Sequence, residues 1–230
     1  MTILYEDNHL IIVNKSCSEI VQADKTGDPS LEEEIKQWLK QTYNKAGNVF
    51  LGVTHRLDRP VTGVVIFAKT SKALARLNEM FRKGEIHKTY FALVKNSPPA
   101  TEGRLEHFLW RNEKQNKSYV SVQEKPGSKK AILDYKLLGR SDRYALLEID
   151  LKTGRHHQIR CQLAGIGCPI KGDLKYGYPR SNPNKGISLH AAAVRFIHPV
   201  SKIELNIKAP FPKEEQLWSF FEQQGSLNQN

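Results

Sequence analysis

The sequence predicts an α+β fold, in which a single domain holds a mixed, mostly antiparallel β-sheet flanked by helices. Short runs with strand-like patterning outnumber the helical stretches in the 230 residues. The strands are not separated by regular helices, as a doubly wound parallel sheet would require. No linker or internal repeat divides the chain. We therefore place one domain at residues 1–223 and a polar C-terminal tail, with frayed last residues, at 224–230.

The N-terminal part of the chain predicts a strand pair followed by a helix. Residues 1–15 alternate and then run apolar, as strands of a sheet do. A helix is expected at about 30–43, because Ser30 is a good N-cap and Glu33 follows three residues later. Its apolar residues repeat at helical spacing and are expected in the core: Leu31, Ile35, Trp38 and Leu39.

The middle of the chain predicts a second helix among strands. Strands are expected at about 63–69 and 88–95, with a helix between them that starts at the cap Ser71. The inward face of this helix is expected to hold Leu74, Leu77, Met80 and Phe81. Residues 116–139 are predicted to form a polar hairpin that turns near Pro126.

The C-terminal part predicts two more strands and two more helices. A strand is expected at 144–151, and a short helix from just after Gly154 to Gly165. Residues 171–186 are rich in Gly, Pro and Lys and indicate a loop. A last strand is expected at 203–208, and the stretch EEQLWSFFEQQ that follows predicts an amphipathic helix.

Composition limits the class of protein. No apolar run approaches the roughly 18–20 residues of a membrane span, and the N-terminus lacks the basic region of a signal peptide. Cys17, Cys161 and Cys168 form no CxxC pair and cannot all pair with one another, which indicates a reducing compartment, the cytoplasm. The net charge of +11 suits a polyanionic partner such as nucleic acid, although many basic proteins bind none specifically.

One acidic residue lies among basic residues in the stretch HRLDRPVTG. Asp58 stands between Arg56 and Arg59, and the segment leads into the apolar run VVIFAK. Pro60 fixes one backbone angle and Gly63 permits an unusual one, so this segment predicts a rigid loop that can hold a functional side chain. The alternative, a turn aspartate that accepts hydrogen bonds from its own backbone, stays open.

A second polar stretch, LKTGRHHQIRCQLAGIGCPIKGD, begins at residue 151. Gly154 ends a strand and Arg155 is expected in the first turn of the next helix, from which its guanidinium can reach a neighbouring loop. A surface arginine bound to solvent or phosphate is the alternative. His156 and His157 lack the i, i+4 spacing and the glutamate of a zinc-protease helix, so packing is the expected role of His156 and no metal site is expected.

These stretches resemble the signatures of the RluA-like pseudouridine synthases. HRLDRPVTG is similar to their HRLD-x-x-TSG pattern, and TGRHHQIR with GCPIKGDLKYG is similar to GR-x-HQIR and G-x-PI-x-GD-x-x-YG. ILYEDNHLIIVNKS, HKTYFALV and SLHAAAVRFIHP resemble further family segments, in family order, from about residue 3 to residue 212. NKSCSEIVQ departs where many relatives carry Pro and Gly after the Lys. The resemblance implies a pseudouridine-synthase-like domain without the N-terminal RNA-binding domain of many members.

The resemblance also implies an isomerase that converts uridine in ribosomal or transfer RNA to pseudouridine, with no cofactor and no metal. Asp58 matches the catalytic aspartate, Arg155 matches the arginine that pairs with it, and Tyr90 matches a tyrosine that stacks against the target uracil. The reaction breaks the bond from ribose to nitrogen 1 of uracil and remakes the link at carbon 5. A carboxylate can form a sugar ester or assist elimination to a glycal, and both routes stay open.

RNA-binding residues are implied as well. Arg56 matches a residue that displaces the target nucleotide from its stack, a step needed by any enzyme that acts on a base, and His55 and Arg59 belong to the same loop. The hairpin at 116–139 and the loop at 171–186 mix Lys or Arg with Tyr, as phosphate and base contacts require, although solvated surface charge is an equal alternative. In the loop, RNA contact is expected of Lys171, Lys175 and Tyr176. We expect a monomer that recognises a stem-loop with the catalytic domain alone.

Two other functional classes remain. A non-catalytic RNA-binding module on the same fold would bind RNA and form no product, although Asp58, Tyr90 and Arg155 are all present. A glycoside or nucleoside hydrolase would need a second carboxylate near Asp58, and no paired-carboxylate motif is found there. Hydrolysis releases a free base, whereas isomerisation leaves the mass of the RNA unchanged.

Overall fold

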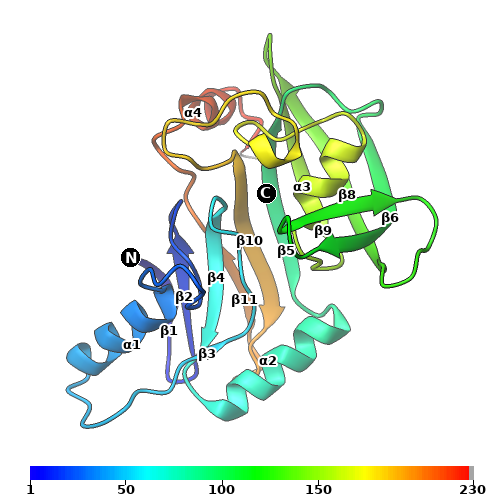
Figure 1. The fold of residues 1–230 in the computed structure, drawn as a ribbon. Coiled ribbons are helices and arrows are strands. Elements are labelled where there is room, and N and C mark those ends of the chain that lie inside the picture. Colours follow the sequence, from blue (N-terminus) through cyan, green and yellow to red (C-terminus); the bar gives the residue numbers. More distant parts are fainter. Residues whose placement is uncertain (228–230) are drawn as a thin grey trace. The chain divides into compact units, whose positions relative to one another are not determined.

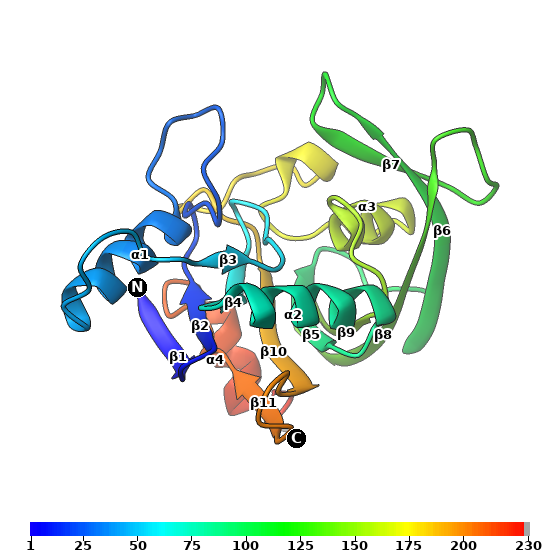
Figure 2. The same cartoon turned by 90° about the horizontal axis from the view of Figure 1, so that it is seen from below.

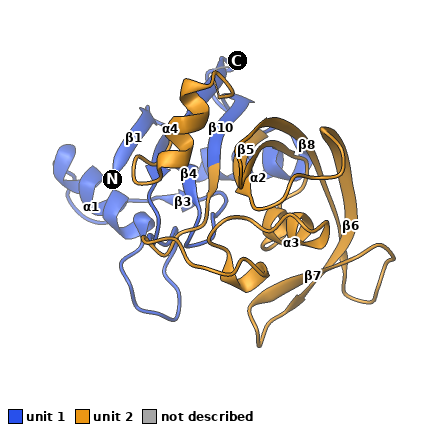
Figure 3. Cartoon of the chain, turned by 90° about the horizontal axis from the view of Figure 1, so that it is seen from above, with its two compact units in different colours: residues 1–86, 191–210 blue, residues 87–190, 211–230 orange. Residues whose placement is uncertain are grey.

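The computed structural model describes residues 1–227, and the chain forms two compact units (Figure 3). Unit 1 comprises residues 1–86 and 191–210, and unit 2 comprises residues 87–190 and those from 211 onward. The last residues of the predicted tail, 228–230, lie outside the described residues. Each unit contains sheet and helix, and every strand pair with an assigned register is antiparallel. The predicted α+β class with a mostly antiparallel sheet is confirmed.

Unit 1 is built on a sheet with the strand order β1-β2-β4-β10 (Figure 1). The short strand β3 also pairs with β4, and β11 pairs with β10. The chain crosses from unit 2 into unit 1 within β10, so no linker separates the units. The bounds are β1 Thr2–Glu6, β2 Leu10–Lys15, β3 Gly52–Val53, β4 Thr62–Ala68, β10 Leu189–Ile197 and β11 Glu204–Lys208.

Two helices complete unit 1 (Figure 2). Helix α1, Leu31–Thr42, begins with the predicted capping box of Ser30 and Glu33. Helix α2, Ser71–Lys83, is capped by Thr70 rather than by Ser71, because the Thr70 hydroxyl accepts the Ala73 N–H. One side of the sheet packs on α2 through a core that includes Leu10, Ile12, Val64, Ile66, Ala73, Leu77 and Met80. The opposite side of β2 is also buried, at Ile11 and Val13. Burial on both sides explains why the sequence of this strand is a continuous apolar run.

Unit 2 is built on a meandering sheet with the strand order β5-β9-β8-β6-β7 (Figures 1 and 2). Its strands are β5 His87–Val94, β6 Glu102–Asn112, β7 Lys117–Ser121, β8 Lys129–Arg140 and β9 Ala145–Leu151. Its helices are α3 Gln158–Gly165, the short 3₁₀ turn η1 Leu174–Tyr176, and α4 Gln216–Gln223. Trp218 and Phe221 of α4 pack with Leu93 and Leu146 of the sheet, as the predicted amphipathic pattern requires.

The predicted hairpin at 116–139 is wrong. Strands β7 and β8 do not pair with each other, because β6 lies between them and pairs with both. The polar turn near Pro126 does connect the two strands, but β7 pairs with β6, the strand before it, and β8 pairs with β6 and β9. Three strands, β3, β6 and β10, were absent from the predicted elements. No helix within residues 1–227 is long and apolar enough to cross a membrane.

Candidate active site

Asp58 lies on the loop that joins β3 to β4 in unit 1, and it is half-buried. The Asp58 backbone carbonyl accepts the Val61 N–H at 3.0 Å, which closes a tight turn directly after the carboxylate. Leu57 is buried beneath the loop, whereas Arg56 is exposed. The loop thus presents a carboxylate and an arginine from a backbone that is anchored on both sides of Asp58.

A buried lysine from β2 holds the far side of this loop. Lys15 is fully buried, and its Nζ donates hydrogen bonds to Val61 O at 2.6 Å, Arg59 O at 3.0 Å and Ser16 O at 3.0 Å. Burial lowers the pKa of Lys15 to about 8, so the ammonium is still protonated at neutral pH and can donate all three bonds. Lys15 was not among the predicted site residues, although its place at the end of the apolar run LIIVN could have indicated a buried lysine.

A glycine is required where the loop enters β4. Gly63 has φ +117°, and a Cβ built there would lie 2.2 Å from Ala191 O on β10. Both facts exclude a side chain at this position. The Gly in the HRLDRPVTG motif therefore serves the close approach of two strand backbones, and Lys15 pairs with it across the β2–β4 ladder.

The other two predicted residues of this loop have partners inside unit 1. His55 Nε2 accepts the Ile66 N–H of β4 at 3.0 Å, and its ring lies 4.9 Å from that of Phe81. Arg59 is exposed, and its guanidinium donates to Thr26 Oγ1 at 3.0 Å and Asp28 Oδ2 at 2.5 Å. His55 thus supports the loop, and Arg59 links it to the polar segment before α1.

Tyr90 lies on β5 in unit 2, opposite Ile149 of β9, and is 7% exposed. Strand alternation sends its neighbour Phe91 to the other face, where Phe91 packs on the cluster around α4. Tyr90 and Phe91 therefore face opposite sides of the sheet. Lys88 shares the face of Tyr90, and burial lowers its pKa.

The sequence predicted Arg155 in the first turn of a helix, and this prediction is wrong. Helix α3 begins only at Gln158, because His157 at its N-cap adopts a left-handed conformation with φ +53°. Arg155 therefore lies in the exposed loop between β9 and α3. Its Nε donates to Lys130 O of β8 at 2.9 Å.

The three predicted residues of the 171–186 loop differ in exposure. Lys171 is partly buried, and its Nζ contacts Asn182 Oδ1 at 2.7 Å and Glu215 Oε1 at 2.6 Å. Lys175 is exposed, and its Nζ donates to the carbonyls of Gln115 and Asn116 at the β6–β7 turn. The loop is thereby tied to that turn and to the segment before α4.

Tyr176 is buried under the same loop, and burial raises its pKa. Its hydroxyl accepts the Ser118 N–H at 2.9 Å and lies within hydrogen-bond distance of His157 Nδ1, at 3.0 Å. Arg160, from α3, stacks on its ring and forms a buried ion pair with Asp173. These contacts use Tyr176 to pack the loop against α3.

The predicted site residues thus divide between the two units. His55, Arg56, Asp58 and Arg59 share one loop of unit 1. The others belong to unit 2: Tyr90, Arg155, Lys171, Lys175 and Tyr176. Within residues 1–227 no group of three or more His, Cys, Asp or Glu side chains could hold a metal ion.

The sequence profile of the RNA pseudouridylate synthase family matches residues 9–165, which include the Asp58 loop, Tyr90 and Arg155. The chain belongs to this family. The resemblance to RluA-like pseudouridine synthases is therefore confirmed, and with it the assignment as an isomerase that converts uridine in RNA to pseudouridine.

Relatives of the pseudouridine synthase family match most of the chain. A tRNA pseudouridine synthase C from Vibrio parahaemolyticus is 30% identical, with 96% of this chain and 95% of that protein covered. A ribosomal large subunit pseudouridine synthase D from Zymomonas mobilis is also 30% identical, with 94% and 71% covered. An uncharacterised RNA pseudouridine synthase from Bacillus subtilis is 30% identical, with 93% and 70% covered.

The fold agrees with the pseudouridine synthase family. The structure of human RNA pseudouridylate synthase domain containing 4 superimposes with a TM-score of 0.80 at 23% identity, and the match covers 99% of this chain and 93% of the human chain. At that identity the likeness concerns the fold alone. It supports the α+β architecture on which the two candidate loops are placed.

Proposed function

We propose that this pseudouridine synthase modifies uridine in ribosomal or transfer RNA, with Asp58 as the catalytic carboxylate. The proposal is supported by the family match over residues 9–165, a range that contains Asp58 and its loop. The resemblance of HRLDRPVTG to the family signature is the reason for choosing Asp58 within that range. Relatives named as ribosomal and transfer RNA enzymes are equally similar to this chain, so both substrate classes are retained.

The proposed reaction begins with an ionised Asp58. The carboxylate either attacks the anomeric carbon of the target uridine or removes a ribose proton, and in both cases the bond to nitrogen 1 of uracil breaks. The freed base turns and its carbon 5 bonds to the anomeric carbon, as the ester to Asp58 breaks or the removed ribose proton returns. The hydrogen on carbon 5 then leaves as a proton, and nitrogen 1 of the base takes up a proton. The freed base stays in the active site until it is re-attached, so the reaction needs no external reactant.

The remaining residues receive roles from the family resemblance. Arg155 is proposed as the cation that acts with Asp58, and Tyr90 as the ring that stacks on the target uracil. Arg56 is proposed to displace the target nucleotide from its stack, and its exposure on the Asp58 loop supports this role.

RNA contacts outside the reacting nucleotide are proposed for exposed cations. Arg59 and Lys175 are exposed, which supports phosphate contact by both. Lys171 and Tyr176 have partners within the chain that favour a role in shaping the loop, and RNA contact by these two stays a prediction. A monomer in the cytoplasm is proposed, and the three cysteines, all free thiols, are compatible with a reducing compartment.

The first experiment maps pseudouridine across the transcriptome of cells that lack this gene and are complemented with wild type or Asp58→Asn. The affected RNA is then transcribed without modification, with tritium at carbon 5 of uridine, and incubated with purified protein. We expect wild type to restore the missing site and to release tritium into water. Asp58→Asn should do neither while binding the RNA with nearly unchanged affinity.

A matched control is Glu34→Gln, which removes an exposed carboxylate from α1 of the same unit. This variant should release tritium at the wild-type rate. Substantial turnover by Asp58→Asn would overturn its assignment. Tight RNA binding by wild type without any tritium release would favour the non-catalytic RNA-binding module, and release of free uracil would indicate a hydrolase.

A further inference from the structure

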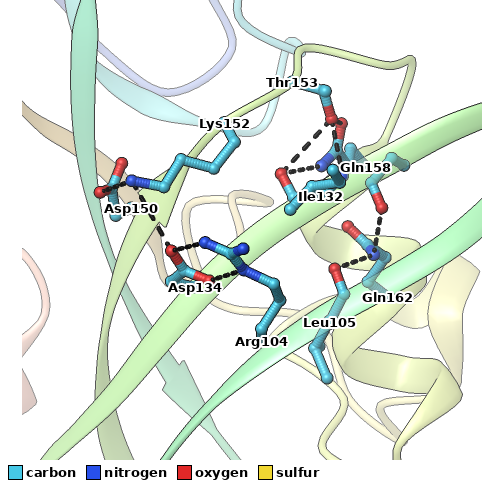
Figure 4. Close-up of polar contacts among 10 residues, drawn as sticks. Arg104, Leu105, Ile132, Asp134, Asp150, Lys152, Thr153, Gln158 and Gln162 are labelled. Carbon is cyan, nitrogen blue, oxygen red and sulfur yellow. Dashed lines mark hydrogen bonds and ion pairs between the residues drawn. The ribbon is translucent and has the colours of Figure 1, made fainter.

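In unit 2 the side chain of Gln158 connects helix α3 with Thr153 and with Ile132 of β8 (Figure 4). Gln158 opens helix α3 and is 3% exposed. Its Oε1 accepts the Arg155 backbone N–H at 2.9 Å and the Thr153 hydroxyl at 2.8 Å. Its Nε2 donates to Ile132 O of β8 at 3.1 Å.

Thr153 extends the same connection to the sheet. Its Oγ1 accepts the Ile132 N–H at 2.8 Å, so its own hydrogen is available for Gln158 Oε1. The backbone N–H of Thr153 also donates to Ile132 O at 3.2 Å. The loop from β9 to α3 is therefore bonded at Thr153 and Arg155 to one amide, and that amide is bonded to β8.

This connection requires an amide at position 158. One end of the side chain must accept two hydrogen bonds and the other end must donate one, and only Asn and Gln offer both functions as neutral groups. A carboxylate could accept from Arg155 but could not donate to Ile132 O. An apolar side chain would leave the partly buried Thr153 hydroxyl and the Arg155 N–H without this acceptor.

The amide acts on Arg155 together with β8. The Arg155 backbone is held by Gln158, and the Arg155 Nε donates to Lys130 O at 2.9 Å, two residues from Ile132 on the same strand. The guanidinium of Arg155 is thus bonded to β8 directly, and its backbone N–H is bonded to β8 through Gln158. These bonds restrict the direction of the guanidinium. Arg155 itself is exposed, so packing alone does not hold its side chain.

We propose that Gln158 is a positioning residue for the isomerisation: its side-chain amide fixes the loop that presents Arg155. The proposal rests on the proposed function, in which Arg155 acts with the catalytic carboxylate. Gln158 touches neither RNA nor reacting atoms in this scheme. Its removal should change how well the arginine is placed, and thus the rate of the bound complex, more than the affinity for RNA.

The same helix offers a matched control. Gln162 lies one turn after Gln158 and is fully buried, and its Nε2 donates to Leu105 O at 3.1 Å and Ala131 O at 3.3 Å (Figure 4). Gln162 therefore also ties α3 to the sheet through an amide. It makes no hydrogen bond with the 153–155 loop in the described residues. Gln158→Met and Gln162→Met remove the same chemical group from the same helix.

The experiment measures single-site kinetics with the C5-tritiated transcript on which wild type is active, together with thermal unfolding of each variant. Both methionine variants should unfold at lower temperature than wild type. Gln158→Met should lower kcat about 10- to 100-fold with KM for the transcript within about twofold, the size expected when a catalytic group is misplaced. Gln162→Met should leave kcat within about twofold.

A conservative variant tests the proposal even if Gln158→Met does not fold. Gln158→Glu keeps the acceptor for the Arg155 N–H and the Thr153 hydroxyl and loses only the donor to Ile132 O. Its kcat should therefore lie between those of wild type and Gln158→Met, or clearly below wild type where the methionine variant is not folded. Wild-type kcat in Gln158→Glu and Gln158→Met, or an equal loss in Gln162→Met, would overturn the proposal.

These outcomes are separable from a failure of the proposed function. If wild type releases no tritium from any transcript, the isomerase proposal fails. If wild type is active and Asp58→Asn is not, while Gln158→Met keeps the wild-type kcat, only the positioning role fails. If Arg155→Ala keeps full activity, the role of Gln158 through Arg155 is overturned as well.

Discussion

The loops that carry Asp58 and Arg155 are each held by one buried side chain, but the two side chains differ in charge. In unit 1 the ammonium of Lys15 binds three carbonyls around the turn that follows Asp58. In unit 2 the neutral amide of Gln158 binds one N–H, one hydroxyl and one carbonyl beside Arg155. Three carbonyls can be bonded by an ammonium group, which only donates hydrogen bonds. A set that contains both donors and acceptors needs an amide, which can accept and donate.

The difference teaches how irregular backbone is made rigid. Neither loop has a helix or strand ladder to satisfy its polar groups, and unsatisfied buried groups are costly. Each unit solves this with a side chain from a neighbouring regular element, Lys15 from β2 and Gln158 from α3. The cationic solution depends on pH and the neutral one does not, which gives the comparison measurable consequences.

The largest expected effect concerns the glycines beside the two loops. Gly63→Ala places a Cβ 2.2 Å from Ala191 O at φ +117°, so the free energy of unfolding should fall by at least about 4 kcal/mol or folding should fail. Gly154→Ala, next to Arg155, meets nothing within 4 Å and has no positive φ, so stability should stay within about 0.5 kcal/mol. Denaturant unfolding measures both. A tolerated Gly63→Ala would show that the strands at the Asp58 loop can separate.

The second prediction compares the two loop-holding residues in activity. Lys15→Met removes the donor to three carbonyls and should lower kcat about 10- to 100-fold by loosening the Asp58 loop. Hydrogen exchange of the Val61 amide, which closes the turn at Asp58, should speed up in parallel. Lys69→Met, which removes an ion pair with Glu6 elsewhere in unit 1, is the control and should keep the wild-type kcat. Unchanged turnover in Lys15→Met would show that Lys15 is not needed to hold the Asp58 loop in its active position.

A third prediction uses the charge of Lys15. Burial lowers its pKa to about 8 in the folded chain, whereas an unfolded lysine has a pKa of about 10.4, so the unfolded state binds more protons between these values. Stability rises with pH wherever the unfolded state binds more protons, so the contribution of Lys15 to the unfolding free energy should rise from about pH 8 to about 10.4. The difference between wild type and Lys15→Met, followed by urea unfolding at several pH values, measures it.

The neutral residue supplies the control for that titration. The difference in unfolding free energy between wild type and Gln158→Met should stay flat over the same pH range, because an amide does not titrate. A flat or falling curve for Lys15 would contradict the assigned direction of its pKa shift. A rising curve for Gln158 would show that other groups, not Lys15, produce the pH dependence.

The smallest expected effect concerns surface cations, one in each unit. Arg59→Ala and Lys175→Ala should each reduce the slope of log affinity against log salt by about 1, because each is proposed to contact one phosphate. Stability should change by less than about 1 kcal/mol in Arg59→Ala, since its pair with Asp28 is exposed. Filter binding from low to high salt measures the slope. An unchanged slope in either variant would exclude phosphate contact by that residue.

Local patterns predicted most of the regular elements. The capping box of Ser30 and Glu33, the α2 stripe around Leu77 and the final amphipathic helix are all present, because these signals lie within a few residues of one another. The hairpin at 116–139 failed because β6, the strand that directly precedes β7 in the chain, pairs with both of its arms. The start of α3 was placed too early because a left-handed His157 is not encoded by any periodicity.

By itself the sequence determined the family, and it pointed to Asp58 and Arg155 as candidate residues, because motifs are recognised from the order and spacing of residues along the chain. Only the tertiary structure decided which side chains hold those loops. Lys15 reaches Arg59 O and Val61 O across 44 and 46 residues, and Gln158 reaches Ile132 O across 26. Such bonds depend on which strands become neighbours, and strand pairing is settled by the packing of the whole sheet rather than by any local pattern.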